Sequence, residues 1–113
     1  MAEDLDLLRG TLDLFVLKTL TWGPMHGLGI LRWIEHVTES RLQIEEGALY
    51  PALHRMEQKG WLDAEWGVTD GNRKAKFYKL TAKGRHQFAA GVSTWERYVR
   101  AAAMVLSARS ATI

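Results

Sequence analysis

The spacing of apolar residues predicts three helices in the first half of the chain, over residues 5–20, 26–38 and 46–59. Gly23-Pro24 ends the first of them and Gly60 ends the third. Each helix has apolar residues three or four positions apart: Leu5, Leu8, Leu12 and Phe15 in the first, Ile30, Ile34 and Val37 in the second, and Leu49, Ala52, Leu53 and Met56 in the third. We therefore expect three amphipathic helices around one core.

The apolar period then changes from that of a helix to that of a strand. Polar and apolar side chains alternate over residues 61–67, which indicates a half-buried strand with the inward residues Leu62, Ala64 and Trp66. Residues 69–73 have the composition of a turn, and residues 74–80 form the returning strand. Thr81 caps a last helix that reaches about residue 107.

One stripe of this last helix has a heptad-like 4-3-4-3-4 spacing, through Phe88, Val92, Trp95, Val99, Ala102 and Leu106. A helix of this size is roughly 39 Å long at about 1.5 Å per residue, too long for the whole stripe to pack on one small domain. A second copy of the chain, packed against this stripe, is the simplest way to bury it. The alternative is that this seam packs only on the first helix of its own chain.

Composition limits the classes of protein to consider. The chain has 113 residues, the size of a single domain, and no cysteine, which excludes disulfide frameworks, Cys-ligated zinc and thiol catalysis. Its 15 Lys and Arg against 13 Asp and Glu give a net charge of only +2. That charge is unevenly spread, because residues 1–46 hold eight acids and four bases whereas residues 47–113 hold five acids and eleven bases.

The basic residues are concentrated in the hairpin and after it. Residues 71–95 contain no acid and six bases, Arg73, Lys74, Lys76, Lys79, Lys83 and Arg85. Such a stretch is either a solvated surface or a face that binds a polyanion.

Three helices followed by a basic hairpin are the elements of a winged helix-turn-helix, so we predict a mainly α fold with a small β-hairpin. In this fold the third helix enters the major groove of DNA and the hairpin lies along the phosphates. The candidate DNA-binding residues of the third helix are Gly47, Tyr50, Pro51, His54 and Arg55, and those of the hairpin are Arg73, Lys74 and Lys76. A winged-helix module that binds protein rather than specific DNA is the alternative.

Three segments carry a family resemblance: GTLDLFVLKTLTWGPMHGLGI, EEGALYPALHRMEQKGWL and NRKAKFYKLTAKGR, at residues 10–30, 45–62 and 72–85. They resemble the PadR family of bacterial transcriptional regulators, in its smaller subgroup with a single C-terminal helix. The resemblance implies a homodimeric DNA-binding regulator, usually a repressor, that dimerises through its C-terminal helix and binds a pseudo-palindromic operator. It places the recognition segment on residues 47–55 and the wing on residues 70–76. It leaves open whether a small aromatic effector releases the DNA.

Two positions depart from the family pattern. Leu28 stands where members often have Tyr, and Glu45-Glu46 stands where many have Thr or Ser followed by Pro. The two acids favour the helix dipole but should repel phosphate at the end of the helix that enters the DNA.

No pattern indicates an enzyme. The four histidines form no HExxH or other i,i+4 ligand pair, so no metal site is predicted. The serines lack a G-x-S-x-G context, and Gly27-Leu28-Gly29 lacks the third glycine of a dinucleotide loop. We therefore expect no catalytic residue and no cofactor.

The five tryptophans fall into two groups. We expect Trp22, Trp33, Trp61 and Trp66 to pack in the core or between helix and hairpin. Trp95 lies within the seam, where it either packs in the dimer interface or, with its partner copy, sandwiches a flat apolar ligand.

The chain divides into two predicted functional parts. Residues 1–81 form the winged helix-turn-helix domain, and residues 82–113 form the dimerisation helix and tail. The first ten residues do not have the character of a signal peptide, and no apolar run approaches the length of a membrane span. We expect a cytoplasmic protein that does not enter the membrane.

Overall fold

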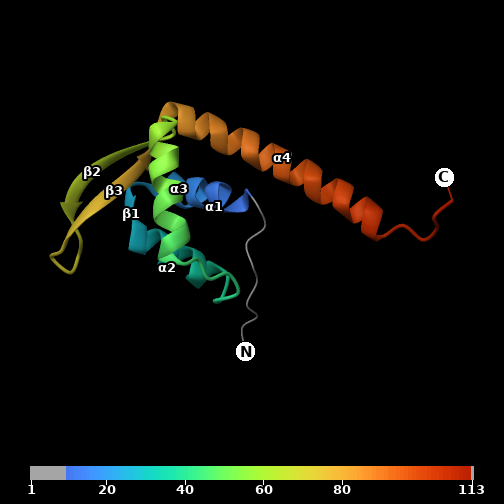
Figure 1. Ribbon diagram of the computed structural model, residues 1–113, viewed down its shortest axis with the longest axis horizontal. Coiled ribbons are helices and arrows are strands. Elements are labelled where there is room, and N and C mark those ends of the chain that lie inside the picture. Colours follow the sequence, from blue (N-terminus) through green and yellow to red (C-terminus); the bar gives the residue numbers. More distant parts are fainter. Residues whose placement is uncertain (1–9, 113) are drawn as a thin grey trace.

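The computed structural model describes residues 10–112 of the chain (Figure 1). In chain order its elements are α1 (Thr11–Thr19), the 3-10 helix η1 (Leu20–Trp22), β1 (Met25–His26), α2 (Gly27–Val37), α3 (Glu46–Gln58), β2 (Leu62–Val68), β3 (Lys74–Leu80) and α4 (Ala82–Leu106). The three helices, the hairpin and the long last helix follow one another as predicted. The part of the first helix expected over residues 5–9 lies outside the described residues.

The sheet has one more strand than the sequence pattern predicts. β1 has only two residues, and it pairs antiparallel with β3 so that Met25 lies opposite Tyr78 and His26 opposite Phe77. The strand order is therefore β1-β3-β2, with β2 at an edge. Two residues are too few to show an alternating pattern, so only the folded chain reveals this strand.

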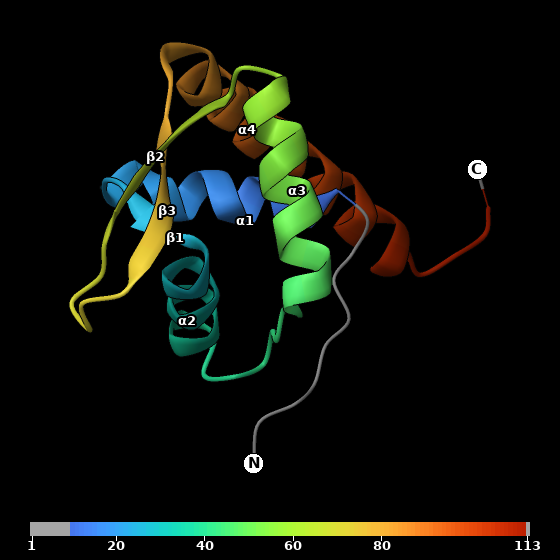
Figure 2. The same cartoon turned by 60° about the vertical axis from the view of Figure 1, so that its left-hand side comes forward.

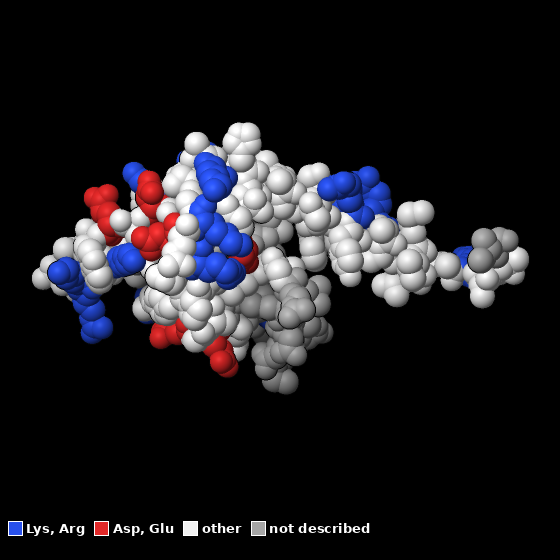
Figure 3. All heavy atoms as spheres, turned by 45° about the horizontal axis from the view of Figure 1, so that its top comes forward, with Lys and Arg blue, Asp and Glu red and all other residues white. Residues whose placement is uncertain are grey.

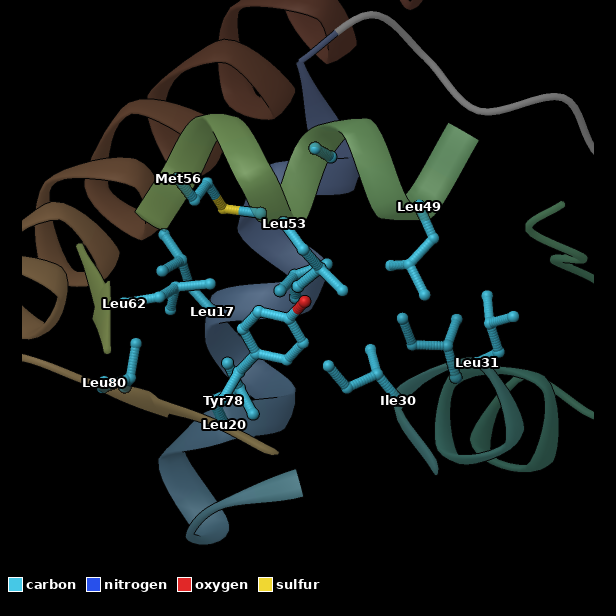
Figure 4. Packing of buried hydrophobic residues seen from close by; sticks show 13 residues of the cluster. Leu17, Leu20, Ile30, Leu31, Leu49, Leu53, Met56, Leu62, Tyr78 and Leu80 are labelled. Carbon is cyan, nitrogen blue, oxygen red and sulfur yellow. The ribbon is translucent and has the colours of Figure 1, made fainter. Parts of the chain in front are cut away.

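The core lies between α1, α2, α3 and the inner face of the sheet. Figure 4 shows side chains of α3 pointing toward those of α1, α2 and the hairpin, with the ring of Tyr78 among them. All four apolar residues predicted for the inner face of α3 are buried, as are Ile30 and Ile34 of α2. Val37 was expected inside but is half exposed, because it lies in the last turn of α2, beyond the last buried residue of that helix.

The end of α3 is a tight turn on Gly60, as its sequence predicts. Gly60 has a φ of 80°, its N–H donates to the carbonyl of Glu57, and the N–H of Trp61 donates to the carbonyl of Met56. These two bonds form a Schellman motif, which requires a residue in the left-handed region at this place. Because glycine adopts that region without strain, the chain can leave α3 directly into β2.

The start of α4 is attached to the same turn. The Thr81 hydroxyl donates to the carbonyl of Gly60 over 2.6 Å and accepts from the N–H of Gly84 over 3.0 Å, which confirms the predicted cap. The N–H of Thr81 donates to the carbonyl of Trp61. Gly84 is buried here, and an added Cβ would lie only 2.1 Å from the Trp61 carbonyl oxygen. The end of α3, the hairpin and α4 are therefore joined at one point.

From this junction α4 extends well beyond the rest of the domain (Figure 1), and the molecule measures 61 × 37 × 22 Å. Its first half packs on α1, where an added Cβ at Gly91 would lie 3.1 Å from Leu14. Its second half leaves apolar side chains exposed, above all Met104, Val105 and Leu106. Within the predicted seam, Phe88 packs against the core whereas Leu106 is 85% exposed. α1 therefore does not cover the whole seam.

The contact at Gly84 gives a first prediction. Replacing Gly84 with Ala puts a methyl group against the backbone of Trp61, and overpacking of this kind costs about 1–3 kcal/mol of unfolding free energy. In an unobstructed helix the same change would stabilise by up to about 1 kcal/mol. Urea denaturation should therefore show a less stable protein.

Gly71→Ala is the matched control for this variant. An added Cβ there would be 3.8 Å from its nearest neighbour, and Gly71 does not have a positive φ. Its unfolding free energy should change little. A stabilised Gly84→Ala protein would contradict the tight junction.

Candidate nucleic-acid interface

The outward face of α3 presents small and polar residues. Gly47, Tyr50, Pro51, His54 and Arg55, all predicted as DNA-binding, are exposed. An added Cβ at Gly47 would meet no atom of the described residues within 4 Å. This face is therefore open to a large partner, and its small residues allow the helix backbone to come close to that partner.

Tyr50 also makes a structural contact that the sequence pattern does not indicate. Its ring lies against Gly27, the first residue of α2, so that an added Cβ there would be 2.7 Å from Tyr50 Cε1. The ring remains 43% exposed. Tyr50 thus holds α2 and α3 in close contact while the residue stays partly exposed. The missing side chain of Gly27 is what permits this close packing.

Arg55 lies on the flank of α3 that faces α1. Its guanidinium forms an ion pair and a hydrogen bond with the carboxylate of Asp13 in α1. Both side chains are partly exposed. Arg55 is therefore engaged within the protein, and a phosphate that binds it must compete with Asp13.

The hairpin presents the other predicted cations. Its turn is closed by a hydrogen bond of 2.8 Å from the N–H of Thr69 to the carbonyl of Arg73, with Asn72 in the left-handed region. Arg73 and Lys74 are exposed beside this turn, and Lys74 Nζ lies 5.4 Å from the centre of the Trp66 ring. The tip of the hairpin is thus cationic, as its sequence indicates.

Lys76 connects the hairpin to α3. Its Nζ lies 3.1 Å from Oε1 of Glu57, and the hydrogen bond to this carboxylate raises the pKa of Lys76. Lys76 is therefore charged at neutral pH, but its charge is partly balanced. To bind a phosphate, Lys76 must therefore either contact the phosphate and Glu57 together or break its bond to Glu57. The same holds for Arg55 and Asp13.

The hairpin and α3 lie on the same side of the domain (Figure 2). In Figure 3, basic side chains gather at the end of the hairpin and again where α3 meets α4. Acidic side chains lie between these two groups. Glu45 and Glu46 at the start of α3 are exposed, and among residues 10–112 no side chain caps that helix end. The charge of the surface is therefore mixed rather than uniformly positive.

Two of the four tryptophans predicted to be packed are instead exposed. Trp33 and Trp61 pack against the core as expected. Trp22 and Trp66 are 65% and 64% exposed, so that part of the prediction is wrong. The alternation placed Trp66 on the correct face of β2, but the strand continues past the edge of the core, so most of this residue stays exposed.

Comparison with known proteins identifies the group to which this chain belongs. Residues 16–90, more than half of the chain, match the model of the transcriptional regulator PadR-like family. The chain belongs to this family. It is therefore a transcriptional regulator of a group that acts by binding DNA and not by catalysis.

Individual proteins show the same relationship. The transcriptional regulator Rv3488 of Mycobacterium tuberculosis is 32% identical over 78 residues, which cover 68% of each chain. A transcriptional regulator from Clostridium thermocellum has a similar structure, with a TM-score of 0.76 and 26% identity over 82% of this chain and 90% of its own. A PadR family regulator from Eggerthella lenta has a TM-score of 0.75 and 26% identity over 89% and 86% of the two chains.

Residues 10–112 lack two features of other protein classes. Within residues 10–112, no three His, Asp or Glu side chains gather as metal ligands. None of the helices in that range is both long and apolar enough to span a membrane.

The ion pair between Lys76 and Glu57 gives a second prediction. Glu57→Gln frees Lys76 for phosphate and removes a negative charge beside α3. An exposed ion pair contributes up to about 1 kcal/mol, so we expect two- to fivefold tighter DNA binding, in order of magnitude. Fluorescence anisotropy with labelled DNA measures this change.

Glu65→Gln is the control, because it removes the same charge from an exposed residue of the hairpin. The register places Glu65 opposite Phe77, on the sheet face away from Lys76. Equal effects of the two variants would mean that only net charge matters and that Glu57 does not restrain Lys76.

Proposed function

We propose that this protein is a homodimeric repressor that binds a pseudo-palindromic operator. Each protomer inserts α3 into a major groove and lays the tip of the hairpin against the adjoining phosphates. The main support is the placement of an open α3 face and a cationic hairpin tip on one side of the domain. Because its ligand is the chromosome, the protein acts in the cytoplasm.

Within this proposal the residues divide by role. Gly47, Pro51 and His54 lie on the outward face of α3 and meet the base edges, with Tyr50 and Arg55 on its two flanks. Arg73, Lys74 and Lys76 neutralise phosphates. Glu45 and Glu46 oppose phosphate at the start of α3, which weakens binding to DNA of any sequence and so favours an operator with good base contacts.

The operator claim gives a third prediction. Gel-shift titration with DNA from upstream of the protein's own gene should show at least about a thousandfold preference over random DNA at moderate salt. Each phosphate contact contributes about −0.9 to the slope of log affinity against log salt. Lys74→Ala should therefore reduce that slope by about 0.9 for each protomer.

Equal affinity for the two DNAs would contradict the operator claim. The protein-binding alternative makes a different prediction. If it holds, reversing the charges of Arg73, Lys74 and Lys76 leaves regulation in the cell unchanged.

We further propose that α4 forms the dimer. Its exposed apolar residues continue the seam past the end of α1, and Val99 within the seam is 44% exposed. An isolated chain would leave this large apolar surface in water, whereas a second α4 would cover it. Residues 82–113 are then the dimerisation part, and residues 1–81 the DNA-binding domain.

The dimer gives a fourth prediction. Val99→Asp places a charge in the seam, and the cost of burying an unpaired charge should raise the dimer dissociation constant by about a hundredfold or more. Sedimentation should then show monomers, and operator affinity should fall with the loss of linked half-sites. Ser93→Asp, at an exposed position of α4 outside the seam, should remain dimeric. A dimeric Val99→Asp protein would contradict the seam.

A small aromatic effector is an additional part of the proposal, supported by a hollow between α1 and α4. Its volume is about 600 Å³, within the usual range for small ligands. Its described lining is mainly apolar and includes Leu14, Gly91, Trp95 and Tyr98. The centres of the Trp95 and Tyr98 rings are 6.4 Å apart, and a flat ligand can stack on either.

This hollow gives a fifth prediction. Acridine, a planar aromatic probe, should quench tryptophan fluorescence at micromolar concentration, and Trp95→Ala should remove most of the response. Trp22→Ala is the control, since Trp22 is exposed and does not line the hollow. Identical quenching of the wild type and Trp95→Ala would exclude Trp95 from the ligand site.

A further inference from the structure

The hairpin carries an apolar pair that no element within residues 10–112 covers. Trp66 is 64% exposed and Val68 is 63% exposed, in the last residues of β2. Most of the indole is therefore in water, where a large apolar side chain is unfavourable relative to a buried one. A partner that buried this pair would therefore gain stability from the contact.

The pair faces the same side of the sheet as α3. In the β2–β3 register Trp66 lies opposite Lys76 and Val68 opposite Lys74. Alternation places these four residues on one face with Tyr78, which is buried in the core under α3. The bond from Lys76 to Glu57 of α3 confirms the direction of that face.

Cations border the ring on this face. Lys74 Nζ lies 5.4 Å from the centre of the Trp66 ring, and Lys76 occupies the position directly across from it. Arg73 is exposed at the adjoining turn. An apolar ring between lysines matches a chain in which anionic groups alternate with apolar rings, and the sugar-phosphate backbone of DNA has that chemistry.

We propose that Trp66, supported by Val68, packs against deoxyribose of the DNA backbone while Lys74 and Lys76 bind the flanking phosphates. This inference rests on the proposed binding of DNA by α3 and the hairpin. It adds an apolar contact that stabilises the complex. It is independent of the base sequence, since every nucleotide presents the same sugar. An acidic protein segment is the competing occupant of this face, and the experiment separates the two.

The test compares Trp66→Ala and Lys74→Ala in operator titrations at several salt concentrations. Burial of the apolar indole against a sugar stabilises the complex, so Trp66→Ala should weaken binding about fivefold or more. Its salt slope should equal that of the wild type, because no charge is lost. Lys74→Ala should instead lower the slope. If Trp66 acted only by placing Lys74, both variants would lower the slope, and the sugar contact would be refuted.

Trp22→Ala is the matched control. Trp22 is equally exposed and also has a lysine over its ring, with Lys18 Nζ 4.8 Å from the ring centre, but it belongs to η1 rather than to the hairpin. Its operator affinity should equal that of the wild type. Thermal unfolding of all variants checks that the fold is retained, and Trp66→Phe, which keeps an aromatic ring, should recover most of the affinity.

A direct readout comes from fluorescence. The emission of Trp66, obtained as the difference between the wild type and Trp66→Phe, should shift or be quenched when operator DNA is added. Unchanged emission and unchanged affinity of Trp66→Ala, with Lys74→Ala still weakened, would overturn this inference and leave DNA binding intact. Failure of the wild type to bind operator DNA would overturn both.

Discussion

The contact between Gly84 and the backbone of Trp61 is the constraint on which the arrangement of the functional elements depends. Because residue 84 has no side chain, the first turn of α4 lies directly on the chain segment that leaves α3. The Thr81 hydroxyl donates to the carbonyl of Gly60 and accepts from the N–H of Gly84, and Gly60 adopts the left-handed conformation that ends α3. The helix proposed to enter DNA and the helix proposed to form the dimer are thus held at one angle, which would set the separation of two recognition helices in a dimer.

Ion pairs within the protein balance part of the charge of its candidate DNA-binding surface. Two of the cations best placed for phosphate, Arg55 and Lys76, are paired with Asp13 and Glu57 from neighbouring elements. These pairs attach α3 to α1 and to the hairpin, so they position the helix while they partly neutralise the two cations. In the proposed function, a DNA phosphate replaces the carboxylate as the partner of the cation in each pair. Such an exchange limits nonspecific affinity, and this is consistent with a chain whose net charge is only +2.

Apolar residues with equally regular spacing are buried in one part of the chain and exposed in another. Leu49, Leu53 and Met56 are buried as predicted, because α1, α2 and β2 all pack against α3. Val37 and Trp66 have equally good periodicity but are exposed, since each lies where its element passes the edge of the core. Periodicity identifies the face of an element, and the reach of the neighbouring elements decides whether that face is covered.

By itself the sequence determined the order of the elements, the inner faces of α2 and α3, the cap at Thr81, the turn at Gly60 and the cationic hairpin tip. All of these depend on residues close together in the chain, whose spacing and backbone preferences are local. Only the tertiary structure decided the strand Met25–His26, the packing of Tyr50 on Gly27 and the pairing of Arg55 with Asp13. Those contacts join residues far apart in the chain, and their geometry exists only once the helices and the sheet have packed together.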